Sequence, residues 1–585
     1  MNLINKAISI LSKKIKKELY LIVFLSFFAM ILETLSVGII LPAISVLLKS
    51  EKKFDVEILN NLVENENAIY LTFVVIFLIF LIKNIFLIFN YKMKINFNEN
   101  IIKSITNNLF YRYIKQDYLF FIKTNTSELL RNTRAEVTSF AFYIDQYTLL
   151  FNELLVLLGI FILIFFLDPL GVTIIASISL LFGFILYAST RNRIKKLGKE
   201  RLEYDGYLTK HLYQGFFAAK EVKILNREND LIKQVRDSLS KFCDVNANYR
   251  FLSGIAKYLF EILMVLCFLI LVVYMSIAGR EPNEIVQYLA VFAVAAFRFI
   301  PAIPRIIYSI QTISYRENSV RVLFKELNNQ ELLKNQNLNN NNQSNEENLN
   351  FNSHIKIKNL SYTYPEKTES TISNISLDIK KGEFVGIIGK TGSGKSTIIN
   401  VLLGLLEPTK GVVEVDANNI RKNIKNWQKK IGYVPQSIYL TDENIKKNIA
   451  FGLIESEIDE NMVQEAVKKA SLDKFINSLP MGLNTPVGEN GIQVSGGQQQ
   501  RIAIARALYH NPDIPVFHEA TSAVDVTTEN QLISSIENLK REKTLVFITH
   551  RLASIKNCDK LLLIEDGKIK ATGLPKEIIS KYNLN

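Results

Sequence analysis

The chain has 585 residues, of which 48% are hydrophobic and 21% charged, and its formal net charge is +13 at pH 7. A single compact core does not usually extend over this length, which predicts at least two domains. Basic loops beside anionic lipid explain the positive charge better than nucleic-acid binding does, and the three widely separated cysteines argue against a disulfide framework or a zinc site. Apolar runs dominate up to about residue 312 and a soluble pattern follows, so we expect a membrane domain followed by a soluble one.

The N-terminal half contains apolar stretches long enough to cross a membrane. The first 20 residues, MNLINKAISILSKKIKKELY, have no signal-peptide cleavage site and predict an amphipathic helix at the membrane surface. A spanning helix needs about 20 apolar residues. Six spans are predicted, at residues 20–48, 68–92, 146–167, 169–190, 256–278 and 284–312.

The charges in the loops predict the orientation of these spans. Four lysines lie at residues 13–17, and the loops at 93–145 and 191–255 are long and rich in Lys and Arg, whereas the loop at 49–67 is acidic. Because cytoplasmic loops carry the excess of Lys and Arg, both termini and both long loops are predicted to be cytoplasmic. We expect the spanning helices to continue into the long loops. The outer segment 54–65 could be a short helix on the outer leaflet or an ordinary loop.

A phosphate-binding motif lies in the C-terminal half. The stretch GEFVGIIGKTGSGKSTIINVLLGLL predicts an apolar strand, a glycine-rich turn and a helix, and it contains the pattern G-x-x-x-x-G-K-[ST]. The backbone N–H groups of such a loop cradle phosphate, while Lys395 reaches the outer phosphates and Ser396 faces Mg²⁺. The predicted nucleotide-binding residues are Gly389, Lys390, Thr391, Gly392, Ser393, Gly394, Lys395, Ser396 and Thr397.

These patterns predict a multidomain fold in three parts. An all-α transmembrane domain of six helices should occupy residues 1–325, and an α/β P-loop nucleotide-binding domain should occupy residues 354–585. Residues 326–353 contain an Asn/Gln-rich run of low hydrophobicity, which is typical of a mobile linker.

Five motifs in the C-terminal half resemble those of a known family. GKTGSGKST, YVPQ, VSGGQQQRIAIARAL, EATSAVD and FITHR occur in the order found in the ATPase domains of ABC transporters. With six predicted spans in the same chain, the sequence resembles an exporter-type half-transporter. The resemblance implies ATP and Mg²⁺ as cofactors. It also implies two such chains, identical or different, with ATP sandwiched between their ATPase domains.

The resemblance implies roles for single residues. Tyr364 would stack on adenine, unless it is an ordinary strand aromatic. Gln436 would contact Mg²⁺ and the attacking water, with Ser396 as the second residue facing the metal. Glu519 would be the general base for the water, and His550 would hold the γ-phosphate and the water in position.

A second set of residues would act across the dimer. The signature residues Ser495, Gly496, Gly497 and Gln498 would close on the γ-phosphate of the partner chain's ATP. Glycines allow close backbone approach, and the helix that follows directs its positive end at the phosphate. Asp525 would lie in a loop that communicates between the two chains.

His518 departs from the family pattern, which has Asp at this position. Neutral imidazole is a poor ligand for Mg²⁺, which prefers oxygen. Pro515 lies in the same strand, where its missing N–H would lose a ladder bond. Three interpretations remain open: a weakened but real ATPase, a degenerate site within a heterodimer, or an inactivating or engineered change.

Two segments of the long loops resemble the short helices on which exporter spans rest against their ATPase domains. They are DYLFFIKTNTSELLRN at 117–132 and YQGFFAAKEVKILNRE at 213–228. The alternative for both is an amphipathic surface helix.

Basic residues within the predicted spans indicate an anionic substrate, because charges inside a membrane are costly and usually functional. Arg binds phosphate through two parallel hydrogen bonds, so cations facing one cavity would suit a phosphate-bearing molecule. Alternatively, the cations pair with Glu33, Glu153 and Glu261, or extend to the interface. The predicted substrate-cavity residues are Lys83, Lys257, Arg298 and Arg305.

A narrower resemblance concerns the spans. ILETLSVGIILPAISVL, the outer amphipathic segment and FRFIPAIPR resemble the lipid-linked oligosaccharide flippases of bacterial N-glycosylation, the PglK type. We therefore predict an ATP-driven flippase or exporter of a lipid-linked oligosaccharide, or a similar amphipathic anion, in the bacterial inner membrane, with its ATPase domain in the cytoplasm. The alternatives are a peptide, lipid or drug exporter of the same architecture, and a degenerate-site partner subunit that barely turns ATP over.

Overall fold

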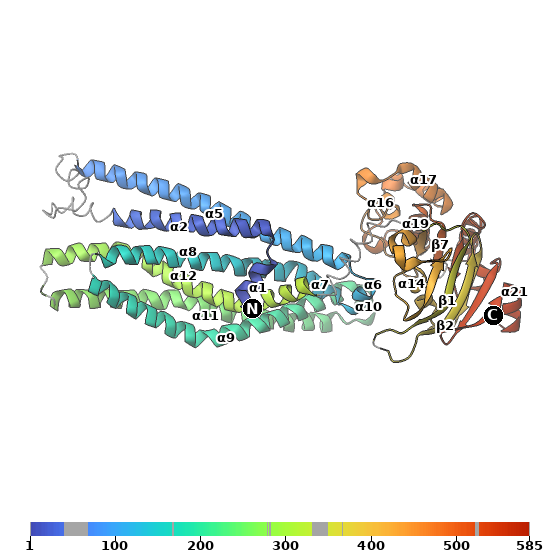
Figure 1. The fold of residues 1–585 in the computed structure, drawn as a ribbon, viewed down its shortest axis with the longest axis horizontal. Helices are drawn as coiled ribbons and strands as arrows, with labels where there is room; N and C mark the ends of the chain where they lie inside the picture. Colours follow the sequence, from blue (N-terminus) through green and yellow to red (C-terminus); the bar gives the residue numbers. More distant parts are fainter. Residues whose placement is uncertain are drawn as a thin grey trace. The chain divides into compact units, whose positions relative to one another are not determined.

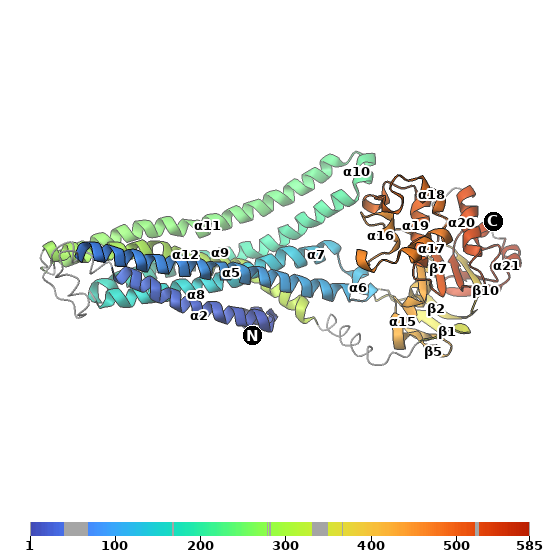
Figure 2. The same ribbon diagram turned by 90° about the horizontal axis from the view of Figure 1, so that it is seen from above.

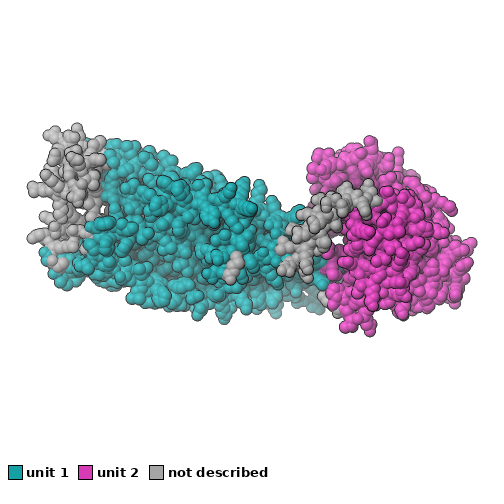
Figure 3. All heavy atoms as spheres, in the orientation of Figure 1, with its two compact units in different colours: residues 1–116, 120–336 teal, residues 117–119, 337–585 magenta. Residues whose placement is uncertain are grey.

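The computed structural model describes residues 2–39, 68–166, 169–277, 279, 282–329, 349–365, 367–520 and 526–583. The chain divides into two compact units (Figure 3): unit 1 contains residues 1–116 and 120–336, and unit 2 contains residues 117–119 and 337–585. The predicted outer segment 54–65 lies outside the described residues, as does most of the predicted linker. The bounds of the three predicted parts therefore stay predictions.

The described residues of the N-terminal part are mostly helical, with short breaks between the helices. Figures 1 and 2 show long helices that run lengthwise through unit 1. The elements are α1 (Leu3–Ile10), α2 (Lys13–Gly38), α5 (Ala68–Ile114), α6 (Tyr118–Lys123), α7 (Thr126–Arg131), the π-helical stretch η1 (Asn132–Glu136), α8 (Val137–Phe165), α9 (Pro169–Phe217), α10 (Ala219–Leu225), α11 (Glu228–Ile277) and α12 (Pro282–Asn328).

Several of these helices are long and apolar enough to cross a membrane. Helix α12 covers the sixth predicted span, but the side chains of residues 282–298 are outside the described part. The count of six spanning helices therefore remains a prediction. Within the described residues five segments qualify, namely Lys13–Gly38, Phe73–Ile114, Thr126–Phe165, Pro169–Phe217 and Glu228–Ile277.

The predicted continuation of the spanning helices into the two long loops is confirmed. Helix α5 runs on to Ile114, α9 runs on to Phe217, and α11 already begins at Glu228. The segments 117–132 and 213–228 contain the short helices α6, α7 and α10. Whether these short helices rest against an ATPase domain stays a prediction.

The N-terminal helix α1 is amphipathic, as the sequence predicts, but its apolar face is covered by protein. Ala7 and Leu11 are buried in a cluster that includes Val320 and Leu323 of α12. The helix is then interrupted at Ser12. The Ser12 hydroxyl accepts a hydrogen bond from the Ile15 N–H and so caps the N-terminus of α2. Because α12 covers this face of α1, the same face is not available to lipid.

Buried polar side chains join η1 to helices α8, α9 and α12. Arg201 of α9 lies 3.4 Å from the Glu136 carboxylate of η1 and donates a hydrogen bond to Ser319 of α12 at 3.0 Å. The Ser319 hydroxyl also bonds to Ser139 of α8, at 2.8 Å. A buried charge is costly without partners, so this network favours one relative position of the four elements.

Unit 2 is an α/β fold with two sheets. A four-stranded antiparallel sheet has the order β2-β1-β4-β5, and a six-stranded sheet has the order β10-β9-β3-β8-β7-β6. In the larger sheet β3, β6, β7, β8 and β9 are parallel, whereas β10 is antiparallel to β9. The strands are β1 (His354–Tyr362), β2 (Ile372–Lys380), β3 (Phe384–Gly389), β4 (Lys410–Val415), β5 (Asn418–Asn419), β6 (Ile431–Val434), β7 (Ile514–His518), β8 (Leu545–Ile548), β9 (Lys560–Glu565) and β10 (Lys568–Gly573).

Hydrophobic side chains cover both faces of the six-stranded sheet. Along β3, Phe384 and Ile388 belong to one cluster with helices α16, α17 and α19, whereas Val385 and Ile387 belong to a second cluster with α14 and the four-stranded sheet. Burial on both faces explains the continuous apolar runs in β7 and β8. The helices of unit 2 are α14 (Lys395–Leu402), α15 (Ile424–Lys429), α16 (Ile445–Ile449), α17 (Glu460–Lys469), α18 (Asp473–Ser478), α19 (Gly496–Leu508), α20 (Val526–Glu537) and α21 (Pro575–Lys581).

The close approach of α9 to α12 gives a test of unit 1. A Cβ atom at Gly198 would lie 2.2 Å from the Tyr315 carbonyl oxygen, whereas a Cβ at Gly215, on the same helix, would meet nothing within 4 Å. We expect Gly198→Ala to lower the free energy of unfolding by roughly 1–3 kcal/mol, because the backbones must separate. Gly215→Ala is the control and should leave stability unchanged or slightly raised. Thermal unfolding of the detergent-solubilised protein measures both, and equal midpoints for the two variants would contradict the packing described.

Candidate functional site

The glycine-rich loop between β3 and α14 has the backbone that phosphate binding requires. Gly389, the last residue of β3, has φ +155°, and a Cβ there would lie 2.2 Å from the Ile564 carbonyl oxygen of β9. Gly394 has φ +98° and precedes α14, which begins at Lys395. Larger residues at these two positions would move the loop. The loop therefore exposes its backbone beside the positive end of a helix.

Two side chains of this loop are buried and directed at the loop itself. The Lys395 ammonium donates to the carbonyl oxygens of Gly389 and Lys390, at 2.7 and 2.8 Å. Burial lowers the pKa of Lys395, and the Glu519 carboxylate opposes this shift. The Ser393 hydroxyl is buried without a hydrogen-bond partner among the described residues. An unpartnered buried hydroxyl inside such a loop fits the binding of phosphate oxygens.

The carboxyl ends of β6, β7 and β8 bring three predicted catalytic residues together. Glu519 follows β7 with φ +52°, and its N–H donates to the Ile548 carbonyl oxygen at 2.7 Å. Its carboxylate accepts a hydrogen bond from Gln436 at 2.7 Å and lies 3.2 Å from His550 Nε2. Both of these neighbours are exposed, so the carboxylate lies at an open edge of the sheet.

His518 is the last residue of β7, and its side chain lies against Ser396 of the phosphate loop. Its side chain is only 7% exposed, with Nε2 3.2 Å from the Ser396 hydroxyl and Nδ1 3.3 Å from the Tyr433 hydroxyl. Burial lowers the pKa of His518; Glu519 opposes the shift and Lys395 adds to it. Burial therefore favours the neutral form of the imidazole. Tyr433 was missed by sequence reasoning, although it opens the YVPQ motif and faces β7 across the ladder.

Pro515 lies in β7 at a position whose nitrogen faces β8. Its neighbour Ile514 donates its N–H to the Lys430 carbonyl oxygen on the β6 side, so the Pro515 nitrogen faces the opposite side. On that side the Thr544 N–H donates to the Asp513 carbonyl oxygen at 3.0 Å, and Val516 is paired with Val546. The missing N–H of Pro515 therefore falls between these two contacts, which agrees with the predicted loss of one ladder bond.

The signature residues start α19. The Ser495 hydroxyl accepts a hydrogen bond from the Gln498 N–H, and the Gln498 side chain accepts one from the Ser495 N–H, which forms a capping box. Gly496 and Gly497 form the first turn of the helix, and Ser495 and Gly496 are exposed. The helix N-terminus is thus open to a ligand or a second chain.

One further predicted residue, Tyr364, is not brought to this cluster, and a second is not described. Tyr364 is half-buried, with its ring 5.0 Å from that of Tyr362, and it packs at the edge of the second hydrophobic cluster. Both of its interpretations, adenine platform and strand aromatic, remain open. Asp525 lies outside the described residues.

The predicted cations of the membrane helices have different surroundings. Lys83 is buried, 3.4 Å from the Ser36 hydroxyl and above the Phe80 ring. Lys257 is exposed, and the side chain of Arg298 is not described.

Arg305 of α12 forms an ion pair with Glu153 of α8. Its guanidinium lies 3.0 Å from the buried Glu153 carboxylate and also donates to the Pro301 carbonyl oxygen at 2.9 Å. The alternative that acids pair with the cations is therefore confirmed at this position. The Arg305 side chain remains 46% exposed, so the ion pair leaves part of it uncovered.

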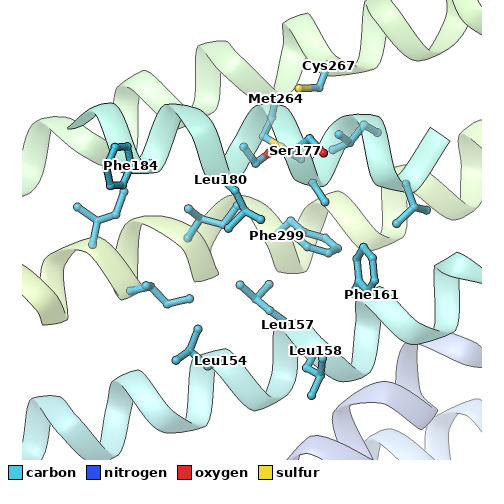
Figure 4. A pocket seen from close by; sticks show the side chains of 18 of the residues that line it. Leu154, Leu157, Leu158, Phe161, Ser177, Leu180, Phe184, Met264, Cys267 and Phe299 are labelled. Atoms are coloured by element: carbon cyan, nitrogen blue, oxygen red, sulfur yellow. The ribbon is translucent and has the colours of Figure 1, made fainter. Parts of the chain in front are cut away.

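A cavity of about 700 Å³ lies between helices α8, α9, α11 and α12 of unit 1. Figure 4 shows side chains such as Leu157, Phe161, Leu180, Met264 and Phe299 converging on it. No charged side chain lines this cavity among the described residues, and none of the three described cations does. Its chemistry suits a hydrocarbon chain rather than a charged group.

Together, a phosphate-binding loop, a carboxylate beside it and several membrane-length helices define a nucleotide-dependent membrane protein. The model of the ABC transporter transmembrane region matches residues 17–299, and the ABC transporter model matches residues 372–522. The chain belongs to the ABC transporters with fused transmembrane and ATP-binding domains, and it is a multi-pass membrane protein. Half-transporters of this family carry one domain of each kind and function as dimers, and the two models match one domain of each kind here.

Known proteins support this assignment to different extents. An ATP-dependent lipid A-core flippase of Bordetella avium is 26% identical over 494 residues, which cover 83% of this chain and 81% of that protein. Plant ABC transporter B family member 14 of Arabidopsis thaliana is 41% identical over 38% of this chain, but the match spans only 18% of its own length. A bacterial Atm1-family ABC exporter with ATP bound has the same fold, with a TM-score of 0.75, 20% identity and 97% coverage of both chains.

The position of Glu519 gives a test of the nucleotide site. We expect Glu519→Gln to retain ATP binding but to slow hydrolysis by about 100-fold or more, because the amide cannot take a proton from water. Glu457→Gln, at an exposed glutamate, is the control and should hydrolyse ATP normally. Binding of a fluorescent ATP analogue and release of phosphate measure the two properties separately. Normal hydrolysis by Glu519→Gln would exclude it as the base.

Proposed function

We propose that this chain is an ATP-driven flippase or exporter that moves an amphipathic anionic lipid, such as a lipid-linked oligosaccharide, across the bacterial inner membrane. The observation that carries the proposal is the Glu519 carboxylate, held by Gln436 and near His550 beside the phosphate loop. This arrangement supports hydrolysis of a bound nucleotide. The similarity to a lipid A-core flippase over most of both chains favours a lipid substrate.

The residues of the site have separate tasks in this proposal. The loop 389–396 binds the phosphates through its N–H groups, and Lys395 turns from the loop carbonyls to the outer phosphates. Glu519 takes a proton from the attacking water, while His550 and Gln436 position the water. Ser495–Gln498 of α19 close on ATP bound to a second chain, which we propose to be identical, and Asp525 communicates across that dimer.

The family implies Mg²⁺ with the ATP, and the donor set here departs from what Mg²⁺ prefers. Ser396 and Gln436 offer oxygen atoms, but the imidazole of His518 occupies the position of a carboxylate. Mg²⁺ takes oxygen ligands in a strict octahedron. The nitrogen donor of His518 therefore fits Mg²⁺ poorly. None of the tasks assigned to the residues of the site depends on Mg²⁺.

The cavity of unit 1 supports a substrate with a hydrocarbon chain. The apolar lining of the cavity can bury such a chain (Figure 4). We propose that Lys83, Lys257, Arg298 and Arg305 interact with the anionic head group. The uncovered part of the Arg305 side chain is the described feature that best suits a phosphate oxygen.

Two other functions are the alternatives to this proposal. A peptide, lipid or drug exporter of the same architecture would use the same nucleotide site with a different cavity ligand. A degenerate-site subunit of a heterodimer is favoured by His518, because this residue disturbs the metal site while leaving nucleotide contacts intact.

Flipping in reconstituted vesicles separates these functions. The chain is placed alone in liposomes that carry a fluorescent polyprenyl-pyrophosphate oligosaccharide, and quenching from one side reports its movement. We expect ATP-dependent movement with the unaltered chain and none with Glu519→Gln. Hydrolysis with movement of a fluorescent peptide instead of the glycolipid would support the other exporter. Hydrolysis only after addition of a second half-transporter would support the heterodimer.

Substitutions in the Arg305–Glu153 ion pair test whether Arg305 contacts the head group of the substrate. Removing only the arginine would leave Glu153 buried without this partner and could destabilise the helices, so we pair the changes as Arg305→Gln with Glu153→Gln. We expect this double variant to fold and hydrolyse ATP but to flip the glycolipid roughly tenfold more slowly, because a charge-assisted hydrogen bond is lost. Lys210→Ala, an exposed change on α9, is the control. Normal flipping by the double variant would remove Arg305 from the substrate site.

A further inference from the structure

The imidazole of His518 is held on both nitrogen atoms. Nδ1 lies 3.3 Å from the Tyr433 hydroxyl on β6, and Nε2 lies 3.2 Å from the Ser396 hydroxyl in the first turn of α14. The residue ends a strand that is paired on both sides, and its side chain is buried. The ring therefore has little freedom to turn away from the phosphate loop.

This arrangement resembles how proteins orient a histidine that binds a metal. Metal-binding imidazoles donate their other ring N–H to an oxygen atom, which fixes the tautomer and the ring plane. When Nδ1–H donates to Tyr433, the lone pair of Nε2 points toward Ser396. The Ser396 hydroxyl is the P-loop group that faces the metal of a bound nucleotide.

The distance between the two donors fits one shared ion. Neighbouring ligands in an octahedron with bonds of about 2.1 Å are about 3 Å apart, and Nε2 and the Ser396 hydroxyl are 3.2 Å apart. No group of three His, Cys, Asp or Glu side chains in the described residues could hold a metal. Phosphate oxygens of the nucleotide and water would have to complete the shell.

We propose that the metal ion bound with the nucleotide at this site is a first-row transition-metal ion, ligated by His518 Nε2 and the Ser396 hydroxyl, and not Mg²⁺. Imidazole nitrogen suits Fe²⁺, Co²⁺, Ni²⁺ and Zn²⁺, and affinity rises from Mn²⁺ through Fe²⁺ and Co²⁺ to Ni²⁺. Mg²⁺ selects oxygen atoms. The inference rests on the proposed nucleotide binding, and it concerns which ion accompanies the nucleotide.

Nucleotide affinity measured with different ions is the first experiment. The full chain in lipid nanodiscs is titrated with a non-hydrolysable fluorescent ATP analogue in the presence of Mg²⁺, Mn²⁺ or Co²⁺. The unaltered chain should bind the analogue most weakly with Mg²⁺, better with Mn²⁺ and best with Co²⁺, with about a tenfold difference between Mg²⁺ and Co²⁺. His518→Asp should bind the analogue more tightly with Mg²⁺ than the unaltered chain does. Tyr433→Phe should lose part of the Co²⁺ preference, because the ring is no longer oriented.

Electron spin-echo spectroscopy of bound Mn²⁺ is the second experiment, and it detects the nitrogen ligand directly. The complex of the unaltered chain with Mn²⁺ and the analogue should show coupling to a directly bound ¹⁴N nucleus. His518→Asp should lose this coupling. His550→Ala should retain it, which controls for the second histidine near the loop.

The outcomes separate this inference from the proposed function. If the analogue binds but the unaltered chain shows no ¹⁴N coupling and prefers Mg²⁺, the inference is wrong while nucleotide binding stands. If the analogue binds neither with any of the three ions nor without a metal, both the inference and the proposed nucleotide binding are wrong. The spectrum of the unaltered chain decides the question even if His518→Asp does not fold.

Discussion

The parallel order of β3, β8, β7 and β6 is the constraint on which the nucleotide site depends. Parallel strands end at the same edge of a sheet, so the phosphate loop, Glu519, Gln436 and His550 meet there although they are up to 161 residues apart in the sequence. Burial of the sheet on both faces holds the strand ends in position. The hydrogen bond from Gln436 to Glu519 and the contact with His550 then tie three strand ends through one carboxylate.

The membrane half depends on a different kind of restraint. Its described helices expose many large apolar side chains to their surroundings, and lipid supplies no hydrophobic force between helices. Close backbone packing at Gly198 and the buried network of Arg201, Glu136 and Ser319 hold one region of the helices together. Elsewhere in the unit, α8, α9, α11 and α12 leave an apolar cavity instead. The same unit thus combines a tightly packed region with a region that can receive a lipid chain.

The sequence predicted much of the fold because its strongest signals are local. The P-loop pattern, the apolar lengths and the continuation of α5, α9 and α11 follow from spacing along the chain. Some partners distant in sequence could not be predicted: Tyr433 beside His518 and α1 against α12 arise only from packing. Pairing of acids with the span cations was one of two alternatives, and only the structure shows that Glu153 is the partner of Arg305. The side of β7 that the Pro515 nitrogen faces likewise depends on register, which periodicity does not show.

The central claim is that the site containing His518 is a working nucleotide hydrolase in a chain that needs no different partner. Phosphate release by the purified chain, reconstituted alone and measured with each divalent ion in turn, tests this claim most directly. The account predicts steady release of phosphate well above that of liposomes without protein, with the ion that binds His518 supporting the faster rate. No release with any ion, followed by release once a second half-transporter is added, would contradict it.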